Sequence, residues 1–61
     1  MSNTNDENLE AIDILVQSRY QFLSDWESEF LEDISVRLEA GKGLTDKQQA
    51  KLDDIWGRIM S

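Results

Sequence analysis

The sequence predicts an all-α protein, either a helical hairpin or a small three-helix bundle, and three features predict it. Apolar residues recur at steps of three and four, which is the spacing of one face of a helix. The 61 residues include no proline, and all three glycines lie in the last third of the chain. Ser24–Glu27 and Thr45–Gln48 match the capping box with which many helices begin. Residues 5–40 therefore contain no strong helix breaker, and two helix starts are marked.

Residues 6–40 carry a long apolar stripe, and we expect helices over about 6–23 and 24–40, preceded by a disordered tail over 1–5. The stripe keeps its helical phase across Ser24, which favours one continuous helix. The capping box of Ser24 and Glu27 favours a break near Leu23 instead. Both alternatives stay open. The stripe consists of Leu9, Ile12, Val16, Tyr20, Leu23, Trp26, Phe30, Ile34 and Leu38.

A glycine turn over 41–45 separates this region from a last helix expected over about 46–59. Gly41 suits the left-handed position that follows a helix end, and Thr45 is the predicted N-cap. Gly57, inside the helix, costs about 1 kcal/mol relative to alanine and either permits close helix packing or marks fraying. The expected apolar residues of this segment are Leu44, Leu52, Ile55, Trp56 and Ile59.

The short turn makes the helices on its two sides antiparallel neighbours. The last helix is too short to cover the apolar face of residues 9–23 as well. Either the first helix folds back and completes a three-helix bundle, or two chains pair and homodimerisation completes the bundle. Residues 6–61 form a single helical domain in both cases.

The composition argues against catalysis and metal binding. The chain has no cysteine and no histidine, so disulfides and thiolate or imidazole ligands are absent, as are the commonest catalytic bases and nucleophiles. We therefore expect a protein that is not an enzyme and has no cofactor and no metal site.

So short a chain is marginally stable alone, and a partner chain is the remaining means of stabilising it.

The charge is acidic and unevenly distributed. The net charge is −7; residues 1–34 hold nine acidic residues and one basic residue, whereas residues 35–61 hold four and five. A net negative chain repels phosphate, so we do not expect direct nucleic-acid binding by the whole molecule.

The start lacks the basic and apolar regions of a signal peptide, and no apolar run is long enough to span a membrane. We expect a cytoplasmic location.

Two sets of residues are candidates for contact with a protein partner. The apolar face of residues 9–23 must be buried against something. Tyrosine and tryptophan, at Tyr20 and Trp56, are residue types enriched among those that dominate binding energies. Trp56 is either core or contact, whereas Trp26 and Phe30 are interpreted as core anchors. The candidate contact residues are Leu9, Ile12, Val16, Tyr20, Leu23 and Trp56. The candidate acidic face consists of Glu27, Glu29, Glu32 and Asp33.

From Trp26 onward, the pattern is a helix with Trp26-Glu27 and Phe30-Leu31, a glycine turn, and then Leu44-Thr45 and Lys47-Gln48 at the start of another helix. This part of the chain resembles a short helical-hairpin module found in phage and bacterial proteins associated with DNA metabolism. The resemblance covers about half of the chain. It implies a phage-type or mobile-element accessory protein. The matching residues are Trp26-Glu27, Phe30-Leu31, Ile34, Arg37-Leu38, Gly41, Leu44-Thr45, Lys47-Gln48, Leu52 and Ile55.

The function expected from these features is that of a small non-catalytic accessory or adaptor protein that binds another protein through a helical surface. The alternative is an acidic inhibitor that imitates the phosphates of DNA and occupies a nucleic-acid-binding protein. In the first case apolar helix residues carry the binding energy and the acidic face guides the encounter. In the second case the acidic face itself carries the interaction.

Overall fold

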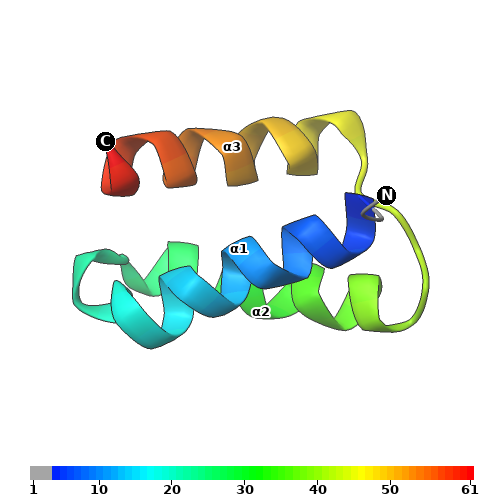
Figure 1. Ribbon diagram of the computed structural model, residues 1–61, viewed down its shortest axis with the longest axis horizontal. Helices are drawn as coiled ribbons and strands as arrows, with labels where there is room; N and C mark the ends of the chain where they lie inside the picture. The colour runs from blue at the N-terminus through cyan, green and yellow to red at the C-terminus, as the bar shows by residue number, and fades with distance from the viewer. Residues whose placement is uncertain (1–3) are drawn as a thin grey trace.

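The computed structural model describes residues 4–61 and shows a three-helix bundle (Figure 1). Helix α1 spans Thr4–Ser18, α2 spans Asp25–Glu39 and α3 spans Asp46–Met60, and a 3₁₀ turn, η1, spans Tyr20–Phe22. The Cα radius of gyration is 10.8 Å, close to the roughly 10.5 Å expected for a compact chain of this length. The predicted all-α class is confirmed, and α1 folds back along α2 within one chain.

The chain breaks between α1 and α2, so residues 6–40 form two helices. Helix α1 ends at Ser18, short of the expected residue 23, because η1 and an extended Leu23 (φ −92°, ψ 137°) lead into α2. The Ser24 hydroxyl accepts the Glu27 N–H at 3.2 Å, and the Glu27 carboxylate accepts the Ser24 N–H at 2.9 Å. This capping box interrupts the helix within the apolar stripe, because its N-cap residue needs an extended backbone.

The first helix also begins earlier than expected. Thr4 and Asn5 are its first residues, although both were expected in a disordered tail. The Asn5 side chain donates a long hydrogen bond (3.4 Å) to the Lys42 carbonyl, which holds the start of α1 near the α2–α3 turn. The rest of the expected tail, residues 1–3, lies outside the described residues.

The α2–α3 turn is formed as the glycine pattern predicts. Gly41 has φ +85°, and its N–H donates to the Leu38 carbonyl at 3.0 Å, while Lys42 N–H donates to the Arg37 carbonyl at 3.1 Å. These two bonds form a Schellman motif, which satisfies the last carbonyls of α2. The capping box of Thr45 then begins α3.

Replacing Gly41 with alanine is expected to lower the free energy of unfolding by about 1 kcal/mol, because a Cβ is disfavoured in the left-handed region. Beyond Gly41 itself and its two chain neighbours, no atom lies within 4 Å of the added Cβ, so the cost arises from the local backbone alone. Urea unfolding followed by circular dichroism measures it. Gly43→Ala is the matched control, since Gly43 has no positive φ and equal open space. Equal losses in both variants would contradict the assignment.

All three helices contribute to one hydrophobic core. Helix α1 supplies two of its buried residues, α2 supplies three and α3 supplies two, so the apolar side of α1 is covered within a single chain. Pairing of two chains stays a prediction. A Cβ added at Gly57 would lie more than 4 Å from every atom of the other helices, and α3 continues past it to Met60. Gly57 therefore makes no close contact with another helix. The core residues are Ile12, Leu15, Leu31, Ile34, Leu38, Leu52 and Ile55.

Candidate functional site

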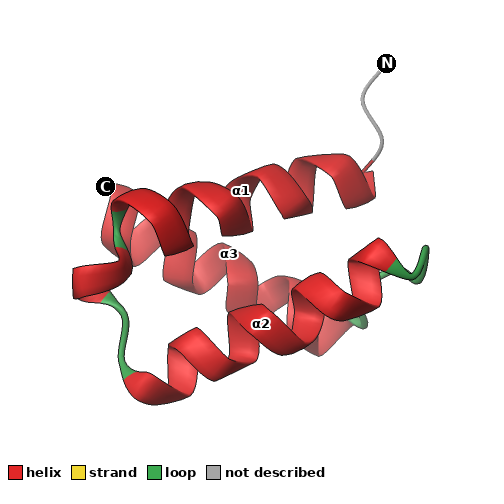
Figure 2. Cartoon of the chain, turned by 90° about the horizontal axis from the view of Figure 1, so that it is seen from below, coloured by secondary structure: helices red, strands yellow, loops and turns green. Residues whose placement is uncertain are grey.

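Three exposed aromatic side chains, hereafter the aromatic corner, lie where the chain passes from α1 to α2. Tyr20, Phe22 and Trp26 are 62%, 58% and 55% exposed. Figure 2 shows this turn at the same end of the bundle as the C-terminus of α3. Phe22 lines a small open pocket with Arg58 and Ile59 of α3. Large aromatic rings that remain in water at one end of a bundle are candidates for contact with another molecule.

The local backbone explains why the rings of Tyr20 and Phe22 are exposed. A 3₁₀ turn of three residues spreads its side chains around the axis, and none of the three in η1 is buried. Leu23 packs against the core immediately afterward. The turn is therefore held by Leu23, while Tyr20 and Phe22 stay exposed.

Trp26 and Phe30 form a stacked pair at the rim of α2. Their ring centroids lie 5.3 Å apart with an interplanar angle of 6°. Lys51 Nζ of α3 lies 5.0 Å from the centroid of the Trp26 ring and 3.9 Å from Asp54. Phe30 is half-buried and packs against the core, but Trp26 is mostly exposed. The interpretation of Trp26 as a core anchor is therefore wrong.

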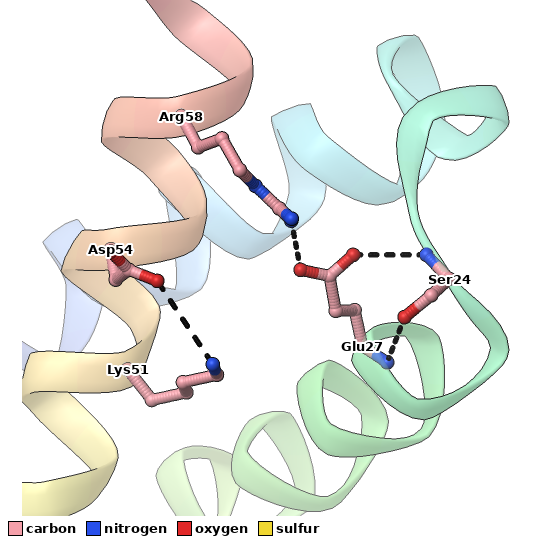
Figure 3. Close-up of polar contacts among 5 residues, drawn as sticks. All are labelled: Ser24, Glu27, Lys51, Asp54 and Arg58. Carbon is pink, nitrogen blue, oxygen red and sulfur yellow. Dashed lines mark hydrogen bonds and ion pairs between the residues drawn. The ribbon is translucent and has the colours of Figure 1, made fainter.

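The residue beside Trp26 is buried in its place. Glu27 shares the inner face of α2 with Leu31, Ile34 and Leu38, because successive helix residues are about 100° apart. Figure 3 shows the Glu27 carboxylate between the Ser24 backbone N–H and the Arg58 guanidinium of α3, both of which donate to it. The placement of Glu27 on a solvated acidic face is a prediction that the structure contradicts.

The surroundings of Glu27 favour its charged form. The hydrogen bond from the Ser24 backbone lowers the pKa of the Glu27 carboxyl below its ordinary value, and the nearby Arg58 lowers it further against the opposing effect of burial. Glu27 therefore joins the start of α2 to the end of α3 as a carboxylate. This role is structural, since its oxygens are occupied by protein donors.

The other three residues of the expected acidic face lie where the sequence places them. Glu29, Glu32 and Asp33 are exposed on α2. Val36 accompanies them and is 66% exposed. The acidic side of α2 thus contains an exposed apolar residue, which the sequence pattern did not single out.

Most of the six expected contact residues pack within the bundle itself. Ile12 is a buried core residue, and Leu9, Val16, Leu23 and Trp56 are partly buried against the core. Tyr20 alone among the six remains mostly exposed. The sequence pattern did not identify Phe22 and Trp26 as exposed. The signal that could have done so is Ser24 as the N-cap of α2. A cap there places Phe22 in the connection and Trp26 in the first turn of α2.

A pair of amide side chains joins α1 to α3. Asn8 Nδ2 donates to Gln49 Oε1 at 2.8 Å, and Gln49 Nε2 donates to Asn8 Oδ1 at 3.2 Å. Gln49 Nε2 also donates to Asp53 Oδ1 at 3.1 Å. Asn8 is buried, and these bonds satisfy its polar atoms. Its partner is 41 residues away in the sequence, so no local pattern indicates the pair.

The described residues offer no arrangement for metal chemistry. Across residues 4–61, no group of three or more acidic, histidine or cysteine side chains is placed to hold a metal ion. Within the same range, no helix combines the length and apolar character needed to cross a membrane. The surface features that remain to be explained are the aromatic corner and the acidic side of α2.

Comparison of the chain with models of known protein families, with curated proteins and with solved structures gave no match.

Proposed function

We propose that this chain is a small non-catalytic accessory or adaptor protein that binds another protein through a helical surface. The supporting observation is the aromatic corner, which exposes Tyr20, Phe22 and Trp26 on a bundle whose core is already filled. The corner spans the 3₁₀ turn and the first turn of α2. The contact surface thus differs from the apolar stripe of α1, which packs inside the bundle.

The chemistry of the corner suits protein recognition. Burying apolar surface contributes about 25 cal/mol per Å², and an aromatic ring is the largest such surface a side chain offers. Tyrosine and tryptophan also add a polar group that fixes the orientation of a partner. Both residue types are enriched where interfaces concentrate their binding energy.

The test is affinity capture of the partner from the source cells, followed by titration of the purified pair. The double variant Tyr20→Ala/Phe22→Ala is expected to weaken binding about tenfold or more, because truncating a central aromatic anchor costs more than 1 kcal/mol. The matched control is Gln17→Ala/Gln21→Ala, which changes two exposed polar neighbours. Unchanged affinity in the aromatic variant, with its helicity intact, overturns the corner as the contact.

Phage or bacterial DNA metabolism in the cytoplasm is the context we propose for this binding. The support is the resemblance of the segment from Trp26 to Ile55 to helical-hairpin modules of such proteins. The two capping boxes and the glycine turn account for part of that resemblance by themselves. Detecting the captured partner among DNA-processing proteins tests the context.

The second candidate is an acidic inhibitor that occupies a nucleic-acid-binding protein, and the exposure of the carboxylates favours it. Such an inhibitor would bind with an affinity that falls steeply with salt. Its binding would survive Tyr20→Ala/Phe22→Ala and fail on reversal of acidic residues. The exposed acidic residues on α1 and α2 include Asp6, Glu10, Asp13, Asp25, Glu29, Glu32, Asp33 and Glu39.

A further inference from the structure

The side of α2 that faces away from the core combines acidic and apolar residues. We call it the outer face of α2; helical spacing places its members together, and every member is exposed. The core side of the same helix is formed by Glu27, Leu31, Ile34 and Leu38. The outer face of α2 consists of Asp25, Trp26, Glu29, Glu32, Asp33 and Val36.

The outer face of α2 carries four carboxylates whose charge is not neutralised by the protein. The ion pairs found within residues 4–61 that involve α2 or α3 join Lys51 to Asp54 and Arg58 to Glu27, and neither includes an acid of this face. Arg37, the base nearest in α2, donates its Nε–H to the Gly43 carbonyl at 2.7 Å. The nearest ammonium is that of Lys51, which lies 5.0 Å from the centroid of the Trp26 ring at one end of the face. Between Trp26 and Val36, a ligand on this face therefore meets mainly carboxylates.

Two apolar side chains, Trp26 and Val36, mark the two ends of this face. They are ten residues apart, which corresponds to about 15 Å along a helix. Glu29, Glu32 and Asp33 lie between them. A helix that lies along α2 matches this pattern if its apolar residues are also about ten residues apart and its intervening residues are lysine or arginine.

We propose that the outer face of α2 binds a basic amphipathic helix of a partner protein, an inference that rests on the proposed protein-binding function. Charge complementarity selects this occupant. A second copy of the chain placed face to face would bring carboxylates against carboxylates, and nucleic acid or an anionic lipid surface would bring phosphates against them. A cationic helix neutralises the face and covers Trp26 and Val36 at the same time.

The test uses a defined probe, a synthetic helical peptide with leucines ten residues apart and lysines between them. In a Trp56→Phe protein, Trp26 is the only tryptophan and its emission reports the contact directly. The peptide is expected to shift this emission to the blue as Trp26 leaves water. A peptide with glutamate in place of lysine is expected to leave the emission unchanged.

Charge reversal identifies the face. Glu29→Lys/Asp33→Lys is expected to weaken peptide binding about tenfold or more, and Val36→Ser about threefold. The matched control is Glu10→Lys/Asp13→Lys, which makes the same change of net charge on exposed positions of α1 and is expected to retain most of the affinity. Equal weakening by both double variants overturns the inference, because the attraction would then be that of the whole molecule. Absence of a Trp26 shift with the basic peptide also overturns it.

Affinities of the same variants for the captured natural partner distinguish this inference from the proposed function. If the affinity for the partner falls in Tyr20→Ala/Phe22→Ala and is unchanged in Glu29→Lys/Asp33→Lys, the basic-helix inference is overturned and the aromatic corner is supported as the contact. An affinity unchanged by both Tyr20→Ala/Phe22→Ala and Glu29→Lys/Asp33→Lys overturns both the basic-helix inference and the aromatic corner as the contact. Loss of binding in both sets supports a contact that runs from the aromatic corner along α2.

Discussion

Replacing Leu15 with alanine is expected to lower the free energy of unfolding by about 2–4 kcal/mol, because it leaves a cavity in the core. Leu15 is 0% exposed and is the α1 residue most deeply placed in the bundle. A domain of this size has a total stability of roughly 3–9 kcal/mol, so the variant is expected to lose much of its folded population. Urea unfolding followed by helical circular dichroism measures the loss.

Val36→Ala is the matched control for this experiment. It also removes apolar atoms, but Val36 is 66% exposed, so the change in stability is expected to stay within about 0.5 kcal/mol. Equal stability of Leu15→Ala and the unaltered protein would show that α1 does not dock as described. A midpoint that rises with protein concentration would point to paired chains instead.

Replacing Glu27 with alanine is expected to destabilise the protein by about 2 kcal/mol. The change removes the hydrogen bond from the Ser24 N–H to the Glu27 carboxylate, one half of the capping box and worth about 1 kcal/mol. It also removes the carboxylate that Arg58 contacts across the bundle. The Arg58 side chain is 57% exposed, so water replaces part of that contact and limits the cost. Glu29→Ala, at an exposed position of the same helix, is the control and is expected to change stability little.

The contribution of Glu27 is expected to depend on pH in one direction. Its pKa is lowered from the ordinary value of 4.5, chiefly by the Ser24 backbone hydrogen bond and also by Arg58. A carboxyl with a depressed pKa in the folded state stabilises the fold fully above its unfolded pKa, and this stabilisation is lost as pH falls through the folded pKa. The difference in melting temperature between the unaltered protein and Glu27→Gln should therefore shrink below about pH 4.5. A difference that stays constant down to pH 3 would contradict this account.

The starts of α2 and α3 and the turn between them depend on local interactions, so they could be predicted from the sequence. The capping boxes at Ser24 and Thr45 join groups three residues apart, and the left-handed turn at Gly41 needs only the missing Cβ. The apolar spacing likewise indicated the buried pair Leu52 and Ile55. For the caps and the turn, most of the free energy comes from neighbours within one or two helical turns, whereas the burial of Leu52 and Ile55 is supplied by α1 and α2.

Only packing between the helices fixes which residues at the start of α2 face the core. The stripe in the sequence included Trp26, but packing of α2 against α1 and α3 turned Glu27 inward and left Trp26 at the rim. Glu27 meets Arg58 across 31 residues of chain, and Asn8 meets Gln49 across 41. Spacing within one helix leaves its rotation uncertain by about one residue, and only contacts between helices fix that rotation. The exposed surface, including the aromatic corner and the outer face of α2, is therefore a consequence of packing, because a ring is available to a partner only where the bundle does not cover it.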